Sequence, residues 1–265
     1  MPHSGGTVRA VLELLGEEGI AVEVAGADGA VARAAYEAAR RLLERLGEEA
    51  RILVRLEHPG LPGSAAAAAA AAARAVAEML GVEPAREDLA EVLLRATALA
   101  KGRPVLPLAA ASYLSAPAVA SEQPAFMTRL PVPKARIYLV ESCDSLPEAG
   151  LAVEAGLYKQ LLQAATVYAS GLYCGDLEPA EAWRLLAQES PWDYAAASEA
   201  REARLRALYE GAYAAGLDPY TGYLVVIAEN MGPAEAAAAV LSRRGCRPRI
   251  LEAEVLGAGE PREEQ

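Results

Sequence analysis

The chain has 265 residues, enough for one large domain or two smaller ones with cores of their own. Hydrophobic residues make up 53% of the sequence and aromatic residues only 5%, so a core has to be built mainly from Ala, Leu and Val. The formal net charge is −11 and no local basic patch interrupts it, so we do not expect nucleic acid as a partner.

The sequence predicts a cytoplasmic protein. Charged residues interrupt every long apolar run, so no transmembrane segment or membrane partner is expected. The first residues, Met1-Pro2-His3-Ser4, have no basic region followed by an apolar stretch, so no signal peptide is expected. The cysteines, at 143, 174 and 246, predict neither a disulfide framework nor a metal site. The scarcity of Asn hints at a thermophile, although a GC-rich genome would look the same.

The first half of the chain is predicted to alternate strands and helices. Apolar residues spaced at about 3.6 positions indicate amphipathic helices, and Gly47 and Gly81 are placed to end two of them. Residues 6–15 are interpreted as a short helix or as the entry to a strand. The expected strands are 20–24 and 51–56, and the expected helices are 31–46, 65–80 and 86–100.

The second half is predicted to be rich in helices. Six prolines between 102 and 135 preclude long helices there, so we expect short strands and an exposed connection. The pattern as a whole predicts an α+β fold with two domains, 1–133 and 134–265. The expected strands beyond residue 135 are 136–140, 223–228 and 249–255, and the expected helical segments are 146–173, 179–187, 193–215 and 233–244.

A glycine-rich turn from Leu56 to Ser64 leads into a run of nine alanines, 65–73. Gly60 and Gly63 allow a tight turn, and Ser64 is expected to cap the helix that follows. A turn of this kind that opens a helix suits an anion, because unpaired N–H groups and the helix dipole both favour negative charge. The alternative is a plain strand–turn–helix joint whose alanines allow close packing.

The same turn resembles the ATP-binding motif of the GHMP kinases, the galactokinase, homoserine kinase, mevalonate kinase and phosphomevalonate kinase superfamily. The matching residues are Gly60-Leu61-Pro62-Gly63-Ser64-Ala65-Ala66. Within that superfamily the chain looks most like the archaeal-type shikimate kinases, on the segments Ser4 to Val8, Ala111-Ser112-Tyr113 and Ala215-Gly216-Leu217. The resemblance implies a two-lobed GHMP-kinase-like sandwich and ATP-dependent phosphorylation of a small-molecule alcohol.

The resemblance also implies where the ligands bind. ATP and Mg²⁺ are the implied cofactors, with Ser64 next to the metal. A small-molecule substrate is the implied partner, and a homodimer is left open. The nucleotide-binding residues would be Gly60, Leu61, Gly63, Ser64 and Ala65, and the substrate-binding residues Ser112, Tyr113, Arg129 and Lys134.

Three departures from the family pattern support a second hypothesis. Asp218-Pro219 stands in a later turn where the family has an anion-binding glycine loop, and Pro219 has no N–H to donate. Pro107 and Leu108 align where the shikimate branch has acidic residues, so no catalytic base is assigned. Pro62 replaces a glycine of the first motif. The alternative to a kinase is therefore a catalytically inactive relative that acts as a binding or assembly protein.

Overall fold

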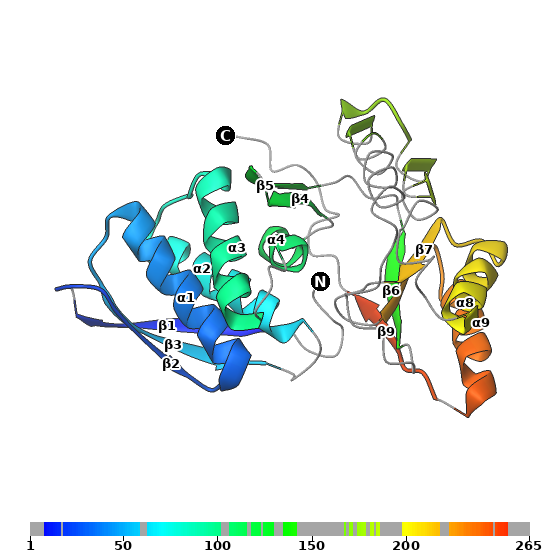
Figure 1. Cartoon of the computed structure of the whole chain (residues 1–265), viewed down its shortest axis with the longest axis horizontal. Helices are drawn as coiled ribbons and strands as arrows, with labels where there is room; N and C mark the ends of the chain where they lie inside the picture. The colour runs from blue at the N-terminus through cyan, green and yellow to red at the C-terminus, as the bar shows by residue number, and fades with distance from the viewer. Residues whose placement is uncertain are drawn as a thin grey trace. The chain divides into compact units, whose positions relative to one another are not determined.

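A computed structural model describes residues 8–16, 18–58, 63–101, 106–115, 118–122, 124–129, 135–141, 198–217, 223–245 and 247–253, with short pieces between 167 and 185. The chain divides into two compact units, Met1–Arg129 and Leu130–Gln265 (Figure 1). Each unit combines helices with a β-sheet and has a hydrophobic core of its own. The predicted α+β fold is confirmed.

A three-stranded sheet with the order β1-β3-β2 forms one layer of the first unit. β1 runs antiparallel to β3, whereas β2 runs parallel to β3 and reaches it through helix α1, which makes a βαβ unit. Residues 6–15, interpreted from the sequence as a short helix or as the entry to a strand, contain strand β1. In it Ala10 and Leu12 alternate with residues that face outward. The bounds are β1 Arg9–Gly16, β2 Ala21–Ala25, α1 Gly29–Leu46 and β3 Arg51–Glu57.

Helices α1 and α2 contact this sheet, and α3 packs against both of them (Figure 1). The bounds are α2 Ser64–Leu80 and α3 Arg86–Lys101. α2 is central, since it contacts α1, α3 and β1, and seven of its nine consecutive alanines are buried. The expectation that the alanine run packs in the interior is therefore confirmed. Small side chains bring helix backbones close together, which explains how a core so poor in aromatic residues is filled.

The proline-rich centre contains a helix that the sequence analysis missed. α4, Leu106–Leu114, is largely buried against α2, and the expected exposed connection was wrong at this point. Pro107 is tolerated because it lies in the first turn, where its missing N–H costs no intrahelical bond. The expected short strands are present as the antiparallel pair β4, Ala118–Glu122, and β5, Ala125–Arg129.

The second unit contains an antiparallel four-stranded sheet with the order β7-β8-β6-β9. α8 and α9 pack together and supply most of the helical part of its core (Figure 1). The bounds are β6 Arg136–Glu141, α8 Ser198–Tyr209, β7 Ala214–Leu217, β8 Tyr223–Ala228, α9 Gly232–Leu241, a 3₁₀ turn Ser242–Arg244 and β9 Ile250–Ala253.

One predicted boundary in this unit was wrong. The helix expected over 193–215 ends at Tyr209, and Ala214 and Ala215 belong to β7. Gly211 has a φ of +94°, which breaks the helix, and β7 then pairs with β8. Of the expected helices at 146–173 and 179–187 the structure describes only scattered residues, and those at 167, 170, 171, 181, 182, 184 and 185 are helical.

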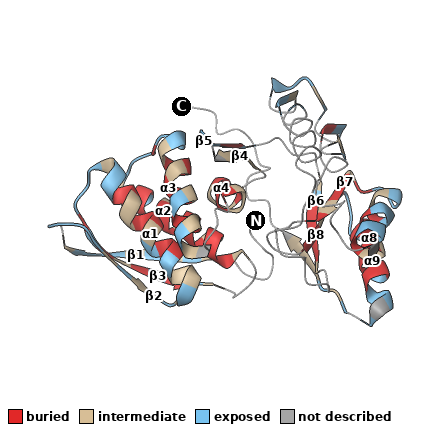
Figure 2. Ribbon diagram, in the orientation of Figure 1, coloured by how far each residue is buried: buried red, intermediate tan, exposed pale blue. Residues whose placement is uncertain are grey.

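Burial follows the layers within each unit (Figure 2). The faces of α1, α2 and α3 that meet one another are buried, and their opposite faces are half-buried or exposed. The described helices include none with the length and apolar character needed to cross a bilayer.

Candidate functional site: the N-terminus of helix α2

The glycine turn meets α2 at Gly63, which is the N-cap of the helix with φ 88° and ψ −9°. Ser64 is the first helical residue, so the expectation that Ser64 caps the helix was wrong. The reason is conformational: the chain enters the helix through a left-handed residue, which glycine adopts more easily than serine. The Gly63 carbonyl accepts the first intrahelical hydrogen bond, from the Ala67 N–H at 3.0 Å.

The start of α2 is chemically suited to a phosphate. The first N–H groups of a helix have no intrahelical acceptor, and the helix dipole adds a partial positive charge at the same end. No acidic side chain lies in the first turn of α2 to neutralise that charge. Ser64 and Ala65 are buried there, with 7% and 2% of their surface exposed, so the donors lie in a shielded environment. Gly60 and Leu61 lie outside the described residues.

Gly26 lets the loop after β2 lie close to the end of β3, the strand that leads into the glycine-rich turn. A Cβ atom at this position would lie 2.2 Å from the carbonyl oxygen of Leu56, and the φ of Gly26 is +83°. The loop after β2 can therefore press against the end of β3 only because residue 26 has no side chain. The sequence analysis did not predict this contact, which joins residues 30 positions apart.

A second polar cluster links α2 to α4. The guanidinium of Arg74 lies 5.2 Å from the centre of the Tyr113 ring. The two terminal nitrogens of Arg74 donate to Ser115 Oγ at 3.3 and 3.2 Å. Burial raises the pKa of the Tyr113 hydroxyl, the positive charge of Arg74 opposes that rise, and Glu83 and Glu78 add to it. The Tyr113 hydroxyl is thus influenced by one cation and two carboxylates of opposite effect.

The two clusters are separated along α2. Arg74 comes ten residues after Ser64, and a rise of 1.5 Å per residue places their Cα atoms about 15 Å apart along the helix axis. The predicted substrate residues Ser112 and Tyr113 are thus gathered near the middle of α2 and away from its first turn. Arg74 was not among the predicted site residues. The signal for it was present, since it is the one charge that ends the alanine run.

The remaining predicted site residues are scattered. Arg129 is exposed at the end of β5, and Lys134 lies outside the described residues, as does the turn at 218–222. Pro107 and Leu108, which align with the family's acidic residues, occupy the first turn of α4 and are half-buried. Among the described residues, no group of three or more His, Cys, Asp or Glu side chains is arranged to hold a metal ion.

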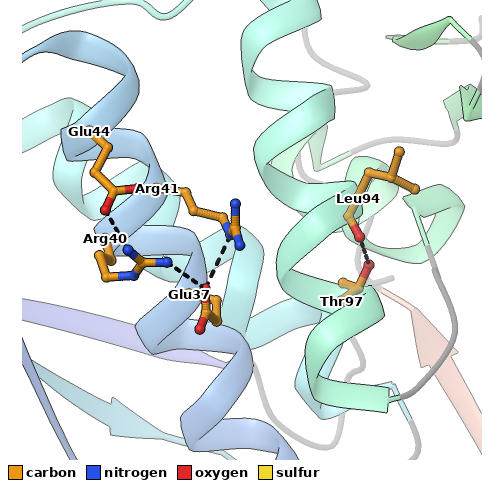
Figure 3. Close-up of polar contacts among 6 residues, drawn as sticks. All are labelled: Glu37, Arg40, Arg41, Glu44, Leu94 and Thr97. Atoms are coloured by element: carbon orange, nitrogen blue, oxygen red, sulfur yellow. Dashed lines mark hydrogen bonds and ion pairs between the residues drawn. The ribbon is translucent and has the colours of Figure 1, made fainter.

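An open cleft of about 460 Å³ lies between α1 and α3, away from the predicted residues. Its charged side chains are largely paired: Arg45 Nε donates to Asp88 Oδ1 at 2.7 Å, and Arg41 Nε donates to Glu37 at 3.1 Å. Figure 3 shows the neighbouring ion pairs along α1 and the Thr97 hydroxyl, which bonds a carbonyl of its own helix. The lining residues are Arg41, Glu44, Arg45, Asp88, Glu91, Val92 and Arg95.

Comparison with known proteins gives a match over the segment that contains the start of α2. Residues 33–114 match the family model described as GHMP kinases N terminal domain. The matched range runs from within α1 to the end of α4, so it includes the start of α2 as well as Arg74 and Tyr113. No curated protein matches the chain.

Solved structures resemble nearly the whole chain. A homoserine kinase from Cytophaga hutchinsonii is 17% identical with a TM-score of 0.63, over 92% of this chain and 84% of that one. The chain has the GHMP kinase fold. The L. major mevalonate kinase, solved with R-mevalonate, is 15% identical with a TM-score of 0.59, over 95% and 87%. A Lin0012 protein from Listeria innocua is 13% identical with a TM-score of 0.62, over 92% and 90%.

These likenesses place the α2 N-terminus within a known scaffold. At identities of 13–17% they establish the fold and leave the substrate open. The shikimate specificity inferred from the sequence is not confirmed by them and stays a prediction. The GHMP superfamily resemblance on which it was built is supported by the match at 33–114.

Proposed function

We propose that this GHMP-fold protein is an ATP-dependent kinase that phosphorylates the hydroxyl group of a small polar molecule. The observation that carries the proposal is the start of α2, where a left-handed Gly63 opens a 17-residue helix with no acidic side chain in its first turn. This helix start lies inside the segment that matches the GHMP kinase N-terminal domain. A phosphate group is the ligand that such a helix end suits best.

In this proposal the backbone N–H groups of Gly63, Ser64 and Ala65 bind the nucleotide phosphates, and Gly60 and Leu61 extend the same loop. ATP with Mg²⁺ supplies the phosphoryl group, and the Ser64 hydroxyl is the side chain nearest to the metal. Phosphoryl transfer depends mainly on positioning and charge stabilisation. The protein's contribution is therefore to hold the phosphates in a shielded place and to orient the acceptor hydroxyl toward them.

The acceptor proposed is shikimate or a related hydroxy acid. A carboxylate needs a cation, and Arg129 is exposed at the end of β5. Lys134 is the second cation assigned to the acid group by the sequence resemblance. Ser112 and Tyr113 complete the proposed substrate side, with Tyr113 already held in place by Arg74.

A second candidate function is a binding or assembly role without catalysis. It is favoured by Pro107 and Leu108, two side chains that cannot accept a proton, at the position where the resemblance expects an acid. Asp218 and Pro219 add to it, because a carboxylate and a residue without an N–H oppose phosphate binding. The missing acid predicts slow or absent turnover. The Asp218-Pro219 turn predicts weak affinity for ATP, improved by the double change Asp218→Gly with Pro219→Gly.

Calorimetry with ATP and Mg²⁺, followed by ADP release with shikimate, homoserine or mevalonate, tests both candidates. Turnover at about 1–1000 per second supports the kinase. Binding without turnover on any acceptor favours the inactive relative. Failure to bind ATP in both the wild type and the Asp218→Gly/Pro219→Gly variant overturns the nucleotide site.

A matched pair of variants locates the binding site. Ala67 and Ala71 are half-buried and lie one turn apart on the same face of α2. Ala67→Glu places a carboxylate at the helix start, where repulsion of about 1–2 kcal/mol should weaken ATP binding about tenfold. The added acid suits the helix dipole, so the helix itself is not weakened. Ala71→Glu is the control, and an equal loss of affinity in both variants would place the phosphates elsewhere.

A further inference from the structure

β1 forms one edge of the first sheet, and its outward-facing residues Arg9, Val11 and Glu13 are all exposed. It pairs with β3, and no other described strand lies beside it (Figure 1). The side chains that point away from the helices include Val11, which is 62% exposed. An exposed edge strand with apolar side chains presents unpaired N–H and C=O groups that another strand can bind. The order of residues along β1 favours one particular partner, the same strand of a second copy of the chain.

The edge of β1 is complementary to itself. Two copies of an antiparallel strand related by a twofold axis pair residue i with residue j so that i and j sum to a constant. When Val11 opposes Val11 of the second copy, Arg9 of each strand lies directly opposite Glu13 of the other. The two charged pairs flank a central apolar pair, all on the outward face. Direct cross-strand pairs of this kind stabilise a sheet.

The ladder within the protomer supports the same register. Arg9 is opposite Glu57 on β3, and Glu13 forms an ion pair with Arg55 at 3.1 Å. In the joined sheets Arg9 would lie between Glu57 of its own protomer and Glu13 of the second copy, and that Glu13 keeps its diagonal ion pair with Arg55 of its own protomer. Sliding one strand by two residues places Val11 opposite Glu13 or opposite Arg9, and sliding it by four places Glu13 opposite Glu13 or Arg9 opposite Arg9, so each shift loses this complementarity.

An irregularity in β1 sets the length of the ladder. The register between β1 and β3 shifts between Leu14 and Gly16, so Leu15 is an extra residue on β1. A bulge bends the strand and ends regular pairing. The register centred on Val11 uses only residues 9–13 and leaves the bulge outside, whereas a register centred on Leu12 would bring Leu15 into the ladder.

We propose that two copies of this chain form a weak dimer through antiparallel β1–β1 pairing centred on Val11. The two three-stranded sheets then become one six-stranded sheet with the order β2-β3-β1-β1-β3-β2. Five residues from each strand make a smaller contact than the roughly 20–30 residues a side of a standard interface, so association is expected only at raised concentration. The proposal is independent of the kinase assignment, because its readout is mass and not activity.

Sedimentation velocity of the full chain from about 1 to about 500 µM tests the dimer. The wild type should shift from monomer to dimer across this range. Val11→Lys puts two ammonium groups face to face at the axis and should weaken the dimer at least about tenfold. Val82→Lys is the control, since Val82 is also exposed, at 41%, but lies in the loop after α2. Thermal unfolding of each variant shows that it is folded.

A charge exchange tests the register directly. Arg9→Glu makes a chain with Glu at both 9 and 13, and Glu13→Arg makes a chain with Arg at both positions, so neither variant should pair with itself. An equimolar mixture should form a heterodimer, because each Glu then faces an Arg. A wild type that stays monomeric, a dimer that survives Val11→Lys, or a mixture that fails to associate would each overturn the proposal.

Discussion

The guanidinium of Arg74 on α2 lies 5.2 Å from the centre of the Tyr113 ring on α4, and it also donates to the hydroxyl of Ser115. Ser115 has a φ of +52°, which is unusual for a residue with a side chain. One arginine therefore joins two helices of the first core and supports a strained residue at the end of α4. The alanines of α2 cannot make such directional contacts.

Arg74→Ala should lower the free energy of unfolding by about 1–2 kcal/mol, through loss of the cation–π contact and of the hydrogen bonds. It should also raise the pKa of Tyr113 further, because Arg74 is the group that opposes the effect of burial. Chemical denaturation measures the first effect, and NMR of ring-labelled tyrosine, assigned with Tyr113→Phe, measures the second. Arg74→Lys keeps the charge and should leave the pKa closer to that of the wild type.

Gly26→Ala should be strongly destabilising, by several times the roughly 1 kcal/mol of backbone strain alone, because the new Cβ would lie 2.2 Å from the Leu56 carbonyl oxygen. Gly47→Ala is the matched control. Its φ is +71° but nothing lies within 4 Å of a Cβ there, so it measures the strain without the clash. Equal losses of stability in urea titrations of the two variants would contradict the close approach.

Ala69→Leu should destabilise the protein by about 1–3 kcal/mol, since Ala69 is fully buried in the core of the first unit and added methylene groups strain a close-packed core. Ala71→Leu, two residues further along the same helix and half-buried, should cost much less. The midpoint of thermal unfolding compares the two. A larger loss for Ala71→Leu would mean that α2 is rotated relative to its described neighbours.

Glu141→Gln should change how stability depends on pH. The hydrogen bond and charge of Arg249 lower the pKa of the Glu141 carboxyl below its ordinary value of 4.5, with Nε to Oε2 at 3.0 Å. A lowered carboxyl pKa contributes stability above pH 4.5, and that contribution is lost as the pH falls through the lower folded value. The effect is small, because both side chains are exposed.

The wild type should therefore be more stable than Glu141→Gln at pH 7, and the difference should shrink progressively as the pH falls below 4.5. Glu23→Gln, which removes one exposed carboxylate from β2, controls for the change in net charge. A difference that does not shrink as the solution is acidified would assign the stabilisation to packing of residue 141 and not to its charge.

The sequence predicted best those elements in which one kind of periodicity runs without interruption. Helices α1, α2 and α3 and strands β3, β6 and β8 lie within two residues of their expected bounds, because their apolar spacing is regular. α4 was missed because Pro107 was interpreted as a breaker when it lies in a first turn. β7, Ala-Ala-Gly-Leu, has no strand propensity of its own and depends on pairing with β8.

Only those parts of the candidate site that are formed by residues close together in the sequence could be predicted. The glycine spacing indicates a turn that opens a helix, and α2 does begin there. Whether Gly63 or Ser64 is the cap depends on one φ angle, which no residue pattern determines. The contacts of Arg74 with Tyr113 and of Gly26 with Leu56 join positions 39 and 30 residues apart, and a single sequence carries no distance information of that kind.

The extra residue at Leu15 has a consequence for solubility. Flat strand edges with exposed Val and Leu side chains are the places where proteins stack into fibres, and β1 has 62% of Val11 and 51% of Leu14 exposed. Because the ladder is interrupted just after Leu14, an added strand can form regular backbone hydrogen bonds only with the first part of β1. Variants that remove the bulge in β1 would therefore lengthen the part of its edge that can pair with another strand, and would make the protein more prone to aggregate on overexpression.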